Sequence, residues 1–213
     1  MDMDELWAKG WTLVDGISSK ADLLNLGKVL GTPTLTSNGE LVKEVRQVPD
    51  LAAPHGSQSS LYGSGPFPLH TDTVFWPTPV KYVLLRAYGD VRRPTTVMSF
   101  DHMVGHCCRE FRLLLHQAVF LVTAGNKKFY CSLKLRCDGL NGWRYDADLM
   151  TPVNDAGREV HSVLRELVSR KDVGNINWSG STAAVLCNWS TLHGRGEQPL
   201  EEGLRVIERL YVR

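Results

Sequence analysis

The stretch GPFPLHTDTVFWPTP, residues 65 to 79, places a histidine and an aspartate two positions apart in an otherwise apolar segment. In a β-strand, residues i and i+2 point to the same face, so His70 and Asp72 are expected to point the same way while Thr71 points to the opposite face. An imidazole and a carboxylate side by side supply two ligands of a three-ligand facial metal site. The alternative is a hydrogen-bonded pair at the end of a strand.

The third ligand is expected to be His193. It follows a strongly apolar segment in LCNWSTLHGRGEQ, where a side chain at a strand end can face a cavity. The glycine after it also lets another backbone or a substrate come close. Two imidazoles and one carboxylate fill one face of an octahedral Fe(II) and leave three positions open. The other histidines lie on expected helices or, for one of them, in a long loop: His102, His106, His116, His161 and His55.

Two arginines in the last expected strand, Arg205 and Arg209, are spaced by four residues and therefore share one face. Guanidinium groups inside a β-structure are costly unless they meet anions, and a dicarboxylate bound near the metal would provide them. The alternative is that both are outward-facing charges at a sheet edge, paired with Glu201 and Glu208.

Composition limits the class of protein. The 213 residues are 43% hydrophobic and 22% charged with a net charge of +1, which suits one soluble globular domain and argues against nucleic acid or anionic lipid as a partner. No apolar run approaches the roughly 20 residues that span a bilayer, and the acidic start MDMDELWAKG is unlike a signal peptide, so a cytoplasmic protein is expected. The five cysteines indicate reduced, mostly buried thiols; a zinc site would use Cys107, Cys108, Cys131 and Cys137.

The elements expected to position these residues are mostly strands. Helices are predicted at 18–31, at 101–117 beginning at Asp101, and at 154–171, and residues 38–65 end in a long loop of the kind that is often a functional lid. Other segments are predicted to form strands. These are 40–48, 81–88, 94–100, a hairpin within 118–136, 142–149, 175–179, 182–189 and 204–213. Many short strands without βαβ alternation predict a sandwich or barrel.

Three segments carry a resemblance to a known family: LHTDTVFWPTPVKYVLLRA, WRYDADLMTPVNDAG and NWSTLHGRGEQPLEEGLRVIERLYVR. Together they resemble the iron(II)- and 2-oxoglutarate-dependent oxygenases of the TauD/TfdA (taurine dioxygenase) superfamily, and the last two are most similar to its clavaminate-synthase-like branch. The resemblance covers residues 60–213. The chain length predicts a single domain over 1–213, with an N-terminal α/β elaboration at 1–50, and the resemblance implies an oxygenase core at 60–213. The implied fold is mainly β with flanking helices, a cupin-like double-stranded β-helix or jelly roll.

The resemblance also implies roles. His70, Asp72 and His193 would bind Fe(II), and Arg205 with Thr96 would bind 2-oxoglutarate, Thr95 being the competing register. Arg209 would face the primary substrate. The implied activity is a dioxygenase that oxidises, most simply hydroxylates, an unactivated C–H bond with O2 and releases succinate and CO2. Because halogenating relatives replace the carboxylate at position 72, Asp72 favours hydroxylation, desaturation or ring formation.

The expected substrate is a small polar molecule that carries a carboxylate, such as an amino acid or a derivative. Asp146 and Asp148 share one face if RYDAD is extended, and in the amino-acid hydroxylases the matching pair can meet a cationic side chain; the alternative is that they cap a turn. Two departures from the superfamily concern how the substrate is covered: a short interval between H-x-D and His193, and Cys187 where an aspartate is common. A zinc hydrolase with the same three ligands and a non-catalytic jelly-roll binding protein are the alternative functions.

Overall fold

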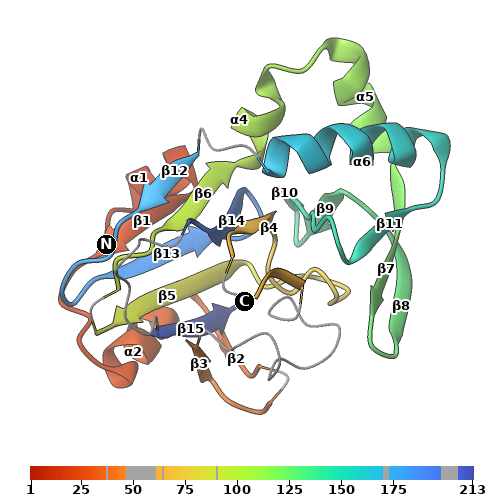
Figure 1. Cartoon of the computed structure of the whole chain (residues 1–213). Coiled ribbons are helices and arrows are strands. Elements are labelled where there is room, and N and C mark those ends of the chain that lie inside the picture. The colour runs from red at the N-terminus through yellow and green to blue at the C-terminus, as the bar shows by residue number, and fades with distance from the viewer. Residues whose placement is uncertain (37, 47–60, 64, 90, 170–172, 198–205) are drawn as a thin grey trace.

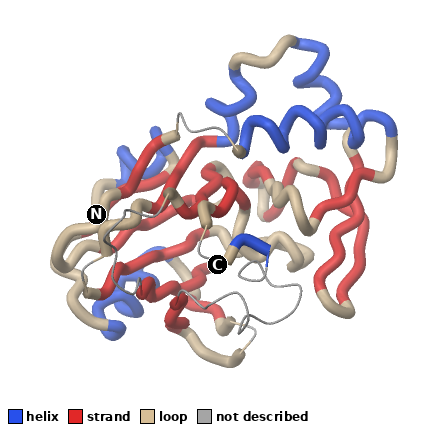
Figure 2. The backbone as a smooth tube through the Cα atoms, in the orientation of Figure 1, coloured by secondary structure: helices blue, strands red, loops and turns tan. Residues whose placement is uncertain are grey.

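The architecture is mainly β, with two antiparallel sheets packed face to face and helices at opposite ends of the molecule (Figures 1 and 2). These features come from a computed structural model, which describes residues 1–36, 38–46, 61–63, 65–89, 91–169, 173–197 and 206–213. No helix in this described part of the chain is both long enough and apolar enough to cross a lipid bilayer.

The larger sheet has the strand order β1–β13–β5–β15–β2, and β3 also pairs with β15. Its strands come from both ends and the middle of the chain: β1 (Trp11–Val14), β2 (Pro33–Thr34), β3 (Val42–Arg46), β5 (Tyr82–Tyr88), β13 (Ala183–Cys187) and β15 (Val206–Val212). The first 46 residues therefore contribute three strands to this sheet, and β1 pairs with β13 although they lie far apart in sequence.

The smaller sheet has the order β12–β6–β14–β4. Its strands are β4 (Phe67–His70), β6 (Thr95–Ser99), β12 (Gly174–Ile176) and β14 (Thr191–Arg195). Because β14 lies between β6 and β4, His193 is the register partner of both Val97 and His70. The sequence predicted three closing strands and placed His193 after the second; in the structure it lies inside a fourth strand, β14.

Alternation along the strands divides the apolar side chains between an inner and an outer layer. Val83 and Leu85 of β5 pack with Val97 of β6 and Ile207 of β15 in the core between the two sheets. Leu84 of β5 points the other way, into the layer beneath α2. This period of two is the pattern expected when both faces of a sheet are covered.

Helices cover the two outer faces. The larger sheet is covered by α1 (Met3–Lys9) and α2 (Lys20–Leu30), and the smaller sheet by α4 (Phe100–Gly105), α5 (Arg109–Gln117) and α6 (Asp155–Val168) (Figure 1). The helix α2 begins at its N-cap Ser19, one of the two serines, Ser18 and Ser19, that the sequence offered as a cap, and Ser19 forms a capping box with Asp22.

Two small sheets extend this scaffold. The hairpin of β7 (Val119–Ala124) and β8 (Lys127–Ser132), predicted with its turn near AGNKK, pairs with β11 (Met150–Pro152) and projects away from the two main sheets (Figure 1). A second pair consists of β9 (Lys134–Cys137) and β10 (Leu140–Trp143).

The helix predicted over 101–117 is wrong as a single element. The side chain of Ser99, not Asp101, caps α4, and the helix ends at Gly105. The sulfur of Cys108 then accepts the backbone N–H of Phe111 and begins α5. Cys108 is a new N-cap, and cysteine has a poor helix propensity. Both facts explain why one apolar pattern gives two helices.

Candidate metal centre

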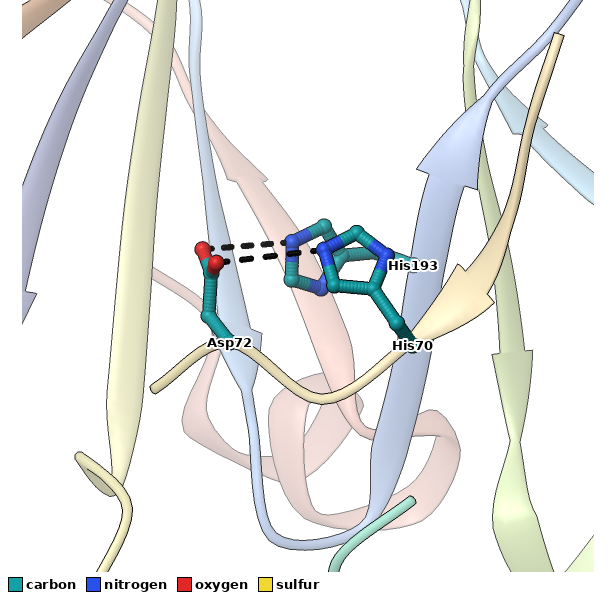
Figure 3. A group of neighbouring side chains, drawn as sticks. All are labelled: His70, Asp72 and His193. Carbon is teal, nitrogen blue, oxygen red and sulfur yellow. Dashed lines mark ion pairs between the residues drawn. The ribbon is translucent and has the colours of Figure 1, made fainter. Parts of the chain in front are cut away.

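His70, Asp72 and His193 come together in the structure (Figure 3). One ligand atom from each lies within 4.8 Å of the others, and all three residues are buried. His193 Nε2 lies 3.4 Å from Asp72 Oδ2, and His70 Nε2 lies 3.8 Å from Asp72 Oδ1. This is the only such cluster of three metal-binding side chains in the described residues, and it is the set that the sequence predicted.

The backbone positions the two histidines through sheet pairing and Asp72 through a turn. His70 and His193 are directly opposite each other on β4 and β14. Asp72 lies beyond the end of β4, so the expectation that it shares a strand with His70 is wrong. Its neighbours are fixed separately: Thr71 exchanges two hydrogen bonds with Tyr145, and Thr73 has a positive φ of 55°. The chain therefore turns as it presents the carboxylate to the imidazoles.

The tautomer of His70 suits metal binding. Its Nδ1 lies 3.1 Å from the backbone oxygen of Pro68. A carbonyl oxygen can only accept, so Nδ1 carries the proton and the lone pair is left on Nε2, the nitrogen that faces Asp72. His193 also turns Nε2 toward Asp72, while its buried Nδ1 has no hydrogen-bond partner among the described residues.

Asp72 is held as an anion. Burial raises its pKa, but the Arg209 guanidinium and the two imidazoles outweigh burial and hold the pKa of the carboxyl well below its usual range. Arg209 Nη1 lies 3.2 Å from each carboxylate oxygen. Burial also lowers the pKa of His193 and outweighs the neighbouring carboxylate, which favours the neutral imidazole that metals require. The donor set therefore fits a divalent cation.

Arg209 points inward rather than to solvent. It alternates with Glu208 along β15, and Glu208 forms a buried ion pair with Arg86, with Nη2 and Oε2 2.6 Å apart, on the opposite face of the sheet. The alternative that Arg209 is an edge charge paired with Glu208 is therefore wrong. The Arg209 guanidinium also stacks over the Tyr211 ring, 4.8 Å from its centroid.

A cavity of about 350 Å³ opens beside His70 and Asp72. Its lining includes His70, Asp72, Arg209, Asp146 and Lys43. Lys43 is the register partner of Arg209 on the adjacent strand β3, so both cations are on the same face of the sheet. Lys43 was not predicted from the sequence, because a lysine in a short strand gives no sign of the face that it occupies.

The structure separates the two aspartates of RYDAD. Residues 144–149 are not the predicted strand: Asp146 Oδ1 accepts the backbone N–H groups of Asp148 and Leu149, each at 2.9 Å, and so closes a turn. Asp146 is 2% exposed and lines the cavity, and burial raises the pKa of its carboxyl. Asp148 instead accepts a hydrogen bond from the Tyr62 hydroxyl at 2.8 Å. Turn capping, one of the two interpretations from the sequence, holds for Asp146.

The two threonines considered for 2-oxoglutarate lie on opposite faces of β6. Val97 is the partner of His193, so Thr95 shares the face of His193 and Thr96 points to the other face. There Thr96 lines a separate cavity of about 590 Å³ near the end of α6. The structure does not bring Thr96 to the metal ligands. Arg205 lies outside the described residues.

Two further residues fix the segment around Asp72, and sequence analysis assigned neither of them a role. Asn188 makes side-chain hydrogen bonds to the backbone of Asp72. Arg144, 5% exposed, donates to the backbone oxygens of Trp76 and Pro77 at 3.2 and 2.6 Å. A buried polar side chain next to an apolar strand was the available signal in both cases, because such groups need partners.

The five cysteines are free thiols, but the expectation that they are mostly buried is wrong, because only Cys187 is buried. Cys107, Cys108, Cys131 and Cys137 form no metal-binding cluster among the described residues, so the cysteine zinc site is wrong.

Comparison with solved structures identifies the fold. An asparagine oxygenase in complex with Fe(II), (2S,3S)-3-hydroxyasparagine and succinate superposes with a TM-score of 0.74 and 20% identity, over 96% of this chain and 74% of that one. The non-heme iron oxygenase OrfP, in complex with Fe, succinate and (3R,4R)-dihydroxy-L-Arg, gives 0.74 and 16%, over 99% and 78%. The PvcB protein from Pseudomonas aeruginosa gives 0.71 and 15%, over 99% and 78%.

The chain thus has the double-stranded β-helix fold of Fe/2-oxoglutarate-dependent oxygenases, and the predicted fold class is confirmed. The chain matches no protein-family model, and no curated protein is similar enough in sequence to match it.

Proposed function

We propose that the protein is an Fe(II)- and 2-oxoglutarate-dependent dioxygenase that hydroxylates an unactivated C–H bond of a small polar substrate. The observation that carries this proposal is the buried cluster of His70, Asp72 and His193 on this fold. Two imidazoles and one carboxylate close together are the donor set of non-haem iron oxygenases, which keep positions open for a co-substrate and O2.

Residues of this chain would hold the metal as follows. His70 and His193 would each bind through Nε2, and Asp72 would bind through one carboxylate oxygen while the other keeps its contact with Arg209. When bound, Fe(II) and 2-oxoglutarate would activate O2, the oxidant: oxidative decarboxylation of 2-oxoglutarate to succinate and CO2 would supply two of the four electrons that reduce O2, and the substrate C–H bond the other two. The apolar and aromatic walls of the cavity, Trp76 and Tyr211 among them, would exclude bulk water from the reacting carbon.

The co-substrate is assigned to Arg205 because the H-G-R and R-x-x-x-R pattern resembles that of the TauD/TfdA oxygenases. A planar guanidinium suits the distal carboxylate because it can donate two parallel hydrogen bonds. The threonine that would bind 2-oxoglutarate is proposed to be Thr95 and not Thr96, because Thr95 lies on the same face of the sheet as His193.

The primary substrate is proposed to be an amino acid or a close derivative. A cavity of about 350 Å³ is near the lower end of ligand sites, which favours a small molecule. Its charged lining has two cations, Arg209 and Lys43, and one carboxylate, Asp146, beyond the metal ligand. An α-carboxylate against the cations and an amino group at Asp146 would complement these charges. Asp148 could bind the cationic end of a longer substrate side chain only if it gave up its hydrogen bond with Tyr62.

An anaerobic titration tests the metal and the co-substrate together. Adding 2-oxoglutarate to the Fe(II)-loaded protein should give the weak visible charge-transfer band of the chelate. His193→Ala should lose this band, whereas His102→Ala, which changes an exposed histidine on α4, should keep it. A folded wild-type protein without the band, or a band that survives in His193→Ala, contradicts the proposal.

Activity assays in air and under argon, with iron or zinc, distinguish the dioxygenase from the two alternative functions. A dioxygenase should release succinate in air but not under argon, and only with iron. A zinc hydrolase would be active under argon with Zn(II). A binding protein would release no succinate with any substrate.

The substrate class is tested with a panel of amino acids, amines, small acids and uncharged lipophilic compounds. Succinate release should rise with compounds that carry both an amino group and a carboxylate, because these complement Asp146 and the two cations. Stimulation by the uncharged lipophilic compounds alone would reject an amino-acid substrate.

A further inference from the structure

Asn188 lies immediately after β13 and is 1% exposed. Its side chain makes three hydrogen bonds, all to backbone groups that are more than 100 residues away in sequence. Its Oδ1 accepts the N–H of Asp72 at 2.9 Å, and its Nδ2 donates to the backbone oxygens of Asp72 at 3.0 Å and Val80 at 2.9 Å. Both backbone polar groups of Asp72 are therefore bound by one side chain.

These bonds replace a missing strand partner. β4 ends at His70, so the Asp72 N–H and C=O have no partner in a sheet ladder, although buried backbone groups need one. An asparagine amide has an acceptor and a donor side by side, so it can pair with a peptide unit much as a neighbouring strand does. The third bond, to Val80, ties the same amide to the start of the segment leading into β5.

The neighbours of Asp72 do not fix it by themselves. Thr71 is bonded to Tyr145, and Thr73 has a positive φ and accepts the backbone N–H of Val80 through its hydroxyl. Between them, a rotation of the Asp72 peptide unit would carry the carboxylate, which already contacts Arg209 at 3.2 Å, away from the two imidazoles. Asn188 opposes this rotation because it fixes both the N–H and the C=O.

We infer that Asn188 is a positioning residue: it holds the Asp72 carboxylate in the direction that completes the metal site with His70 and His193. This inference rests on the proposed function, because it assigns a role in binding the metal. Side chains that orient a metal ligand typically change metal affinity by about 10- to 100-fold when they are removed.

The chain provides a matched control in Asn154. Its side chain also makes three hydrogen bonds to the backbone, accepting from Val119 and Gly157 and donating to Gln117, but it caps α6. Asn188→Ala and Asn154→Ala should therefore both lower the free energy of unfolding. Only Asn188→Ala should weaken Fe(II) binding, by about 10- to 100-fold, and shift the charge-transfer band of the Fe(II)–2-oxoglutarate chelate.

The outcomes separate the two proposals. Wild-type protein that binds no Fe(II) refutes the proposed function. Wild-type protein that binds Fe(II), with equal affinities in Asn188→Ala and Asn154→Ala, refutes the role of Asn188 alone.

A measurement on the wild-type protein covers the case in which Asn188→Ala does not fold. With ¹⁵N-labelled asparagine, the side-chain amide signal of Asn188 should shift when Zn(II), a diamagnetic probe, is added, because the amide is bonded to the backbone of a ligand. The signal of Asn154 should stay in place. An Asn188 signal that stays unchanged while Zn(II) binds would overturn the inference.

Discussion

His70, His193 and Arg209 all approach the carboxylate of Asp72, and each affects what the residue can do. His70 and His193 face it with Nε2, and Arg209 donates to both of its oxygens at 3.2 Å. The arginine was expected to contact the primary substrate. Because Arg209 contacts Asp72, a substrate anion bound to Arg209 would also be held close to the proposed metal site.

Arg205 and Arg209 are expected to differ in role at the residue scale. Arg205→Lys should raise the concentration of 2-oxoglutarate required for half-maximal formation of the charge-transfer band by at least tenfold, about 1.4 kcal/mol. The reason is that lysine cannot reproduce the two parallel hydrogen bonds of a guanidinium with a carboxylate.

Arg209→Lys is the control for this change. It should leave the requirement for 2-oxoglutarate nearly unchanged and instead raise the KM of the primary substrate. If the 2-oxoglutarate requirement rises in Arg209→Lys and not in Arg205→Lys, then Arg209 binds 2-oxoglutarate and the assignment to Arg205 is wrong.

At the scale of elements, the close approach of β4 and β14 depends on Gly194, the residue after His193. A methyl group there would lie 2.4 Å from the backbone oxygen of Phe67 and 2.8 Å from the Thr96 hydroxyl oxygen. The sequence suggested that this glycine lets another backbone or a substrate come close. The structure identifies the neighbour as the backbone of β4, the strand that ends at His70.

Gly194→Ala should therefore destabilise the protein by about 1–3 kcal/mol, because the backbone of β4 must move to admit the methyl group. Chemical denaturation measures this change, and Fe(II) affinity should fall with it because β4 carries His70.

Gly105→Ala is the matched control. Gly105 is the last residue of α4 and has no atom within 4 Å of the added methyl group, so the change should be neutral or slightly stabilising. Equal effects of the two substitutions would show that steric contact with β4 does not matter.

At the scale of the whole molecule, long-range pairing builds the site. The ligands from residues 70–72 and from residue 193 meet because β14 pairs with β4, and Arg209 and Lys43 reach the same cavity because β15 pairs with β3. The outer face of the larger sheet has its own long-range contact, since buried Arg86 bonds both Glu208 and the backbone oxygen of Ser18. The site and its supports thus depend on strands from both ends of the chain.

The sequence by itself determined the features that are local or periodic. The H-x-D pair and the distal His193 predicted which three side chains cluster, and the apolar strands and the hairpin at AGNKK predicted a β sandwich or barrel. Strand β14 escaped prediction because four of its five residues are buried, which removes the alternation that indicates a strand. The two-helix division at Cys108 escaped because a cysteine is an unusual cap.

Tertiary structure alone decided the contacts between distant segments. Asp146 lines the cavity, whereas Asp148 bonds to Tyr62. Thr95, not Thr96, lies on the same face of the sheet as His193. Asn188 and Arg144 reach the segment around Asp72. The physical reason is that a one-residue change of register or a single turn reverses the direction of a side chain. Local sequence patterns do not encode that register, because it is fixed by which strands pair across the fold.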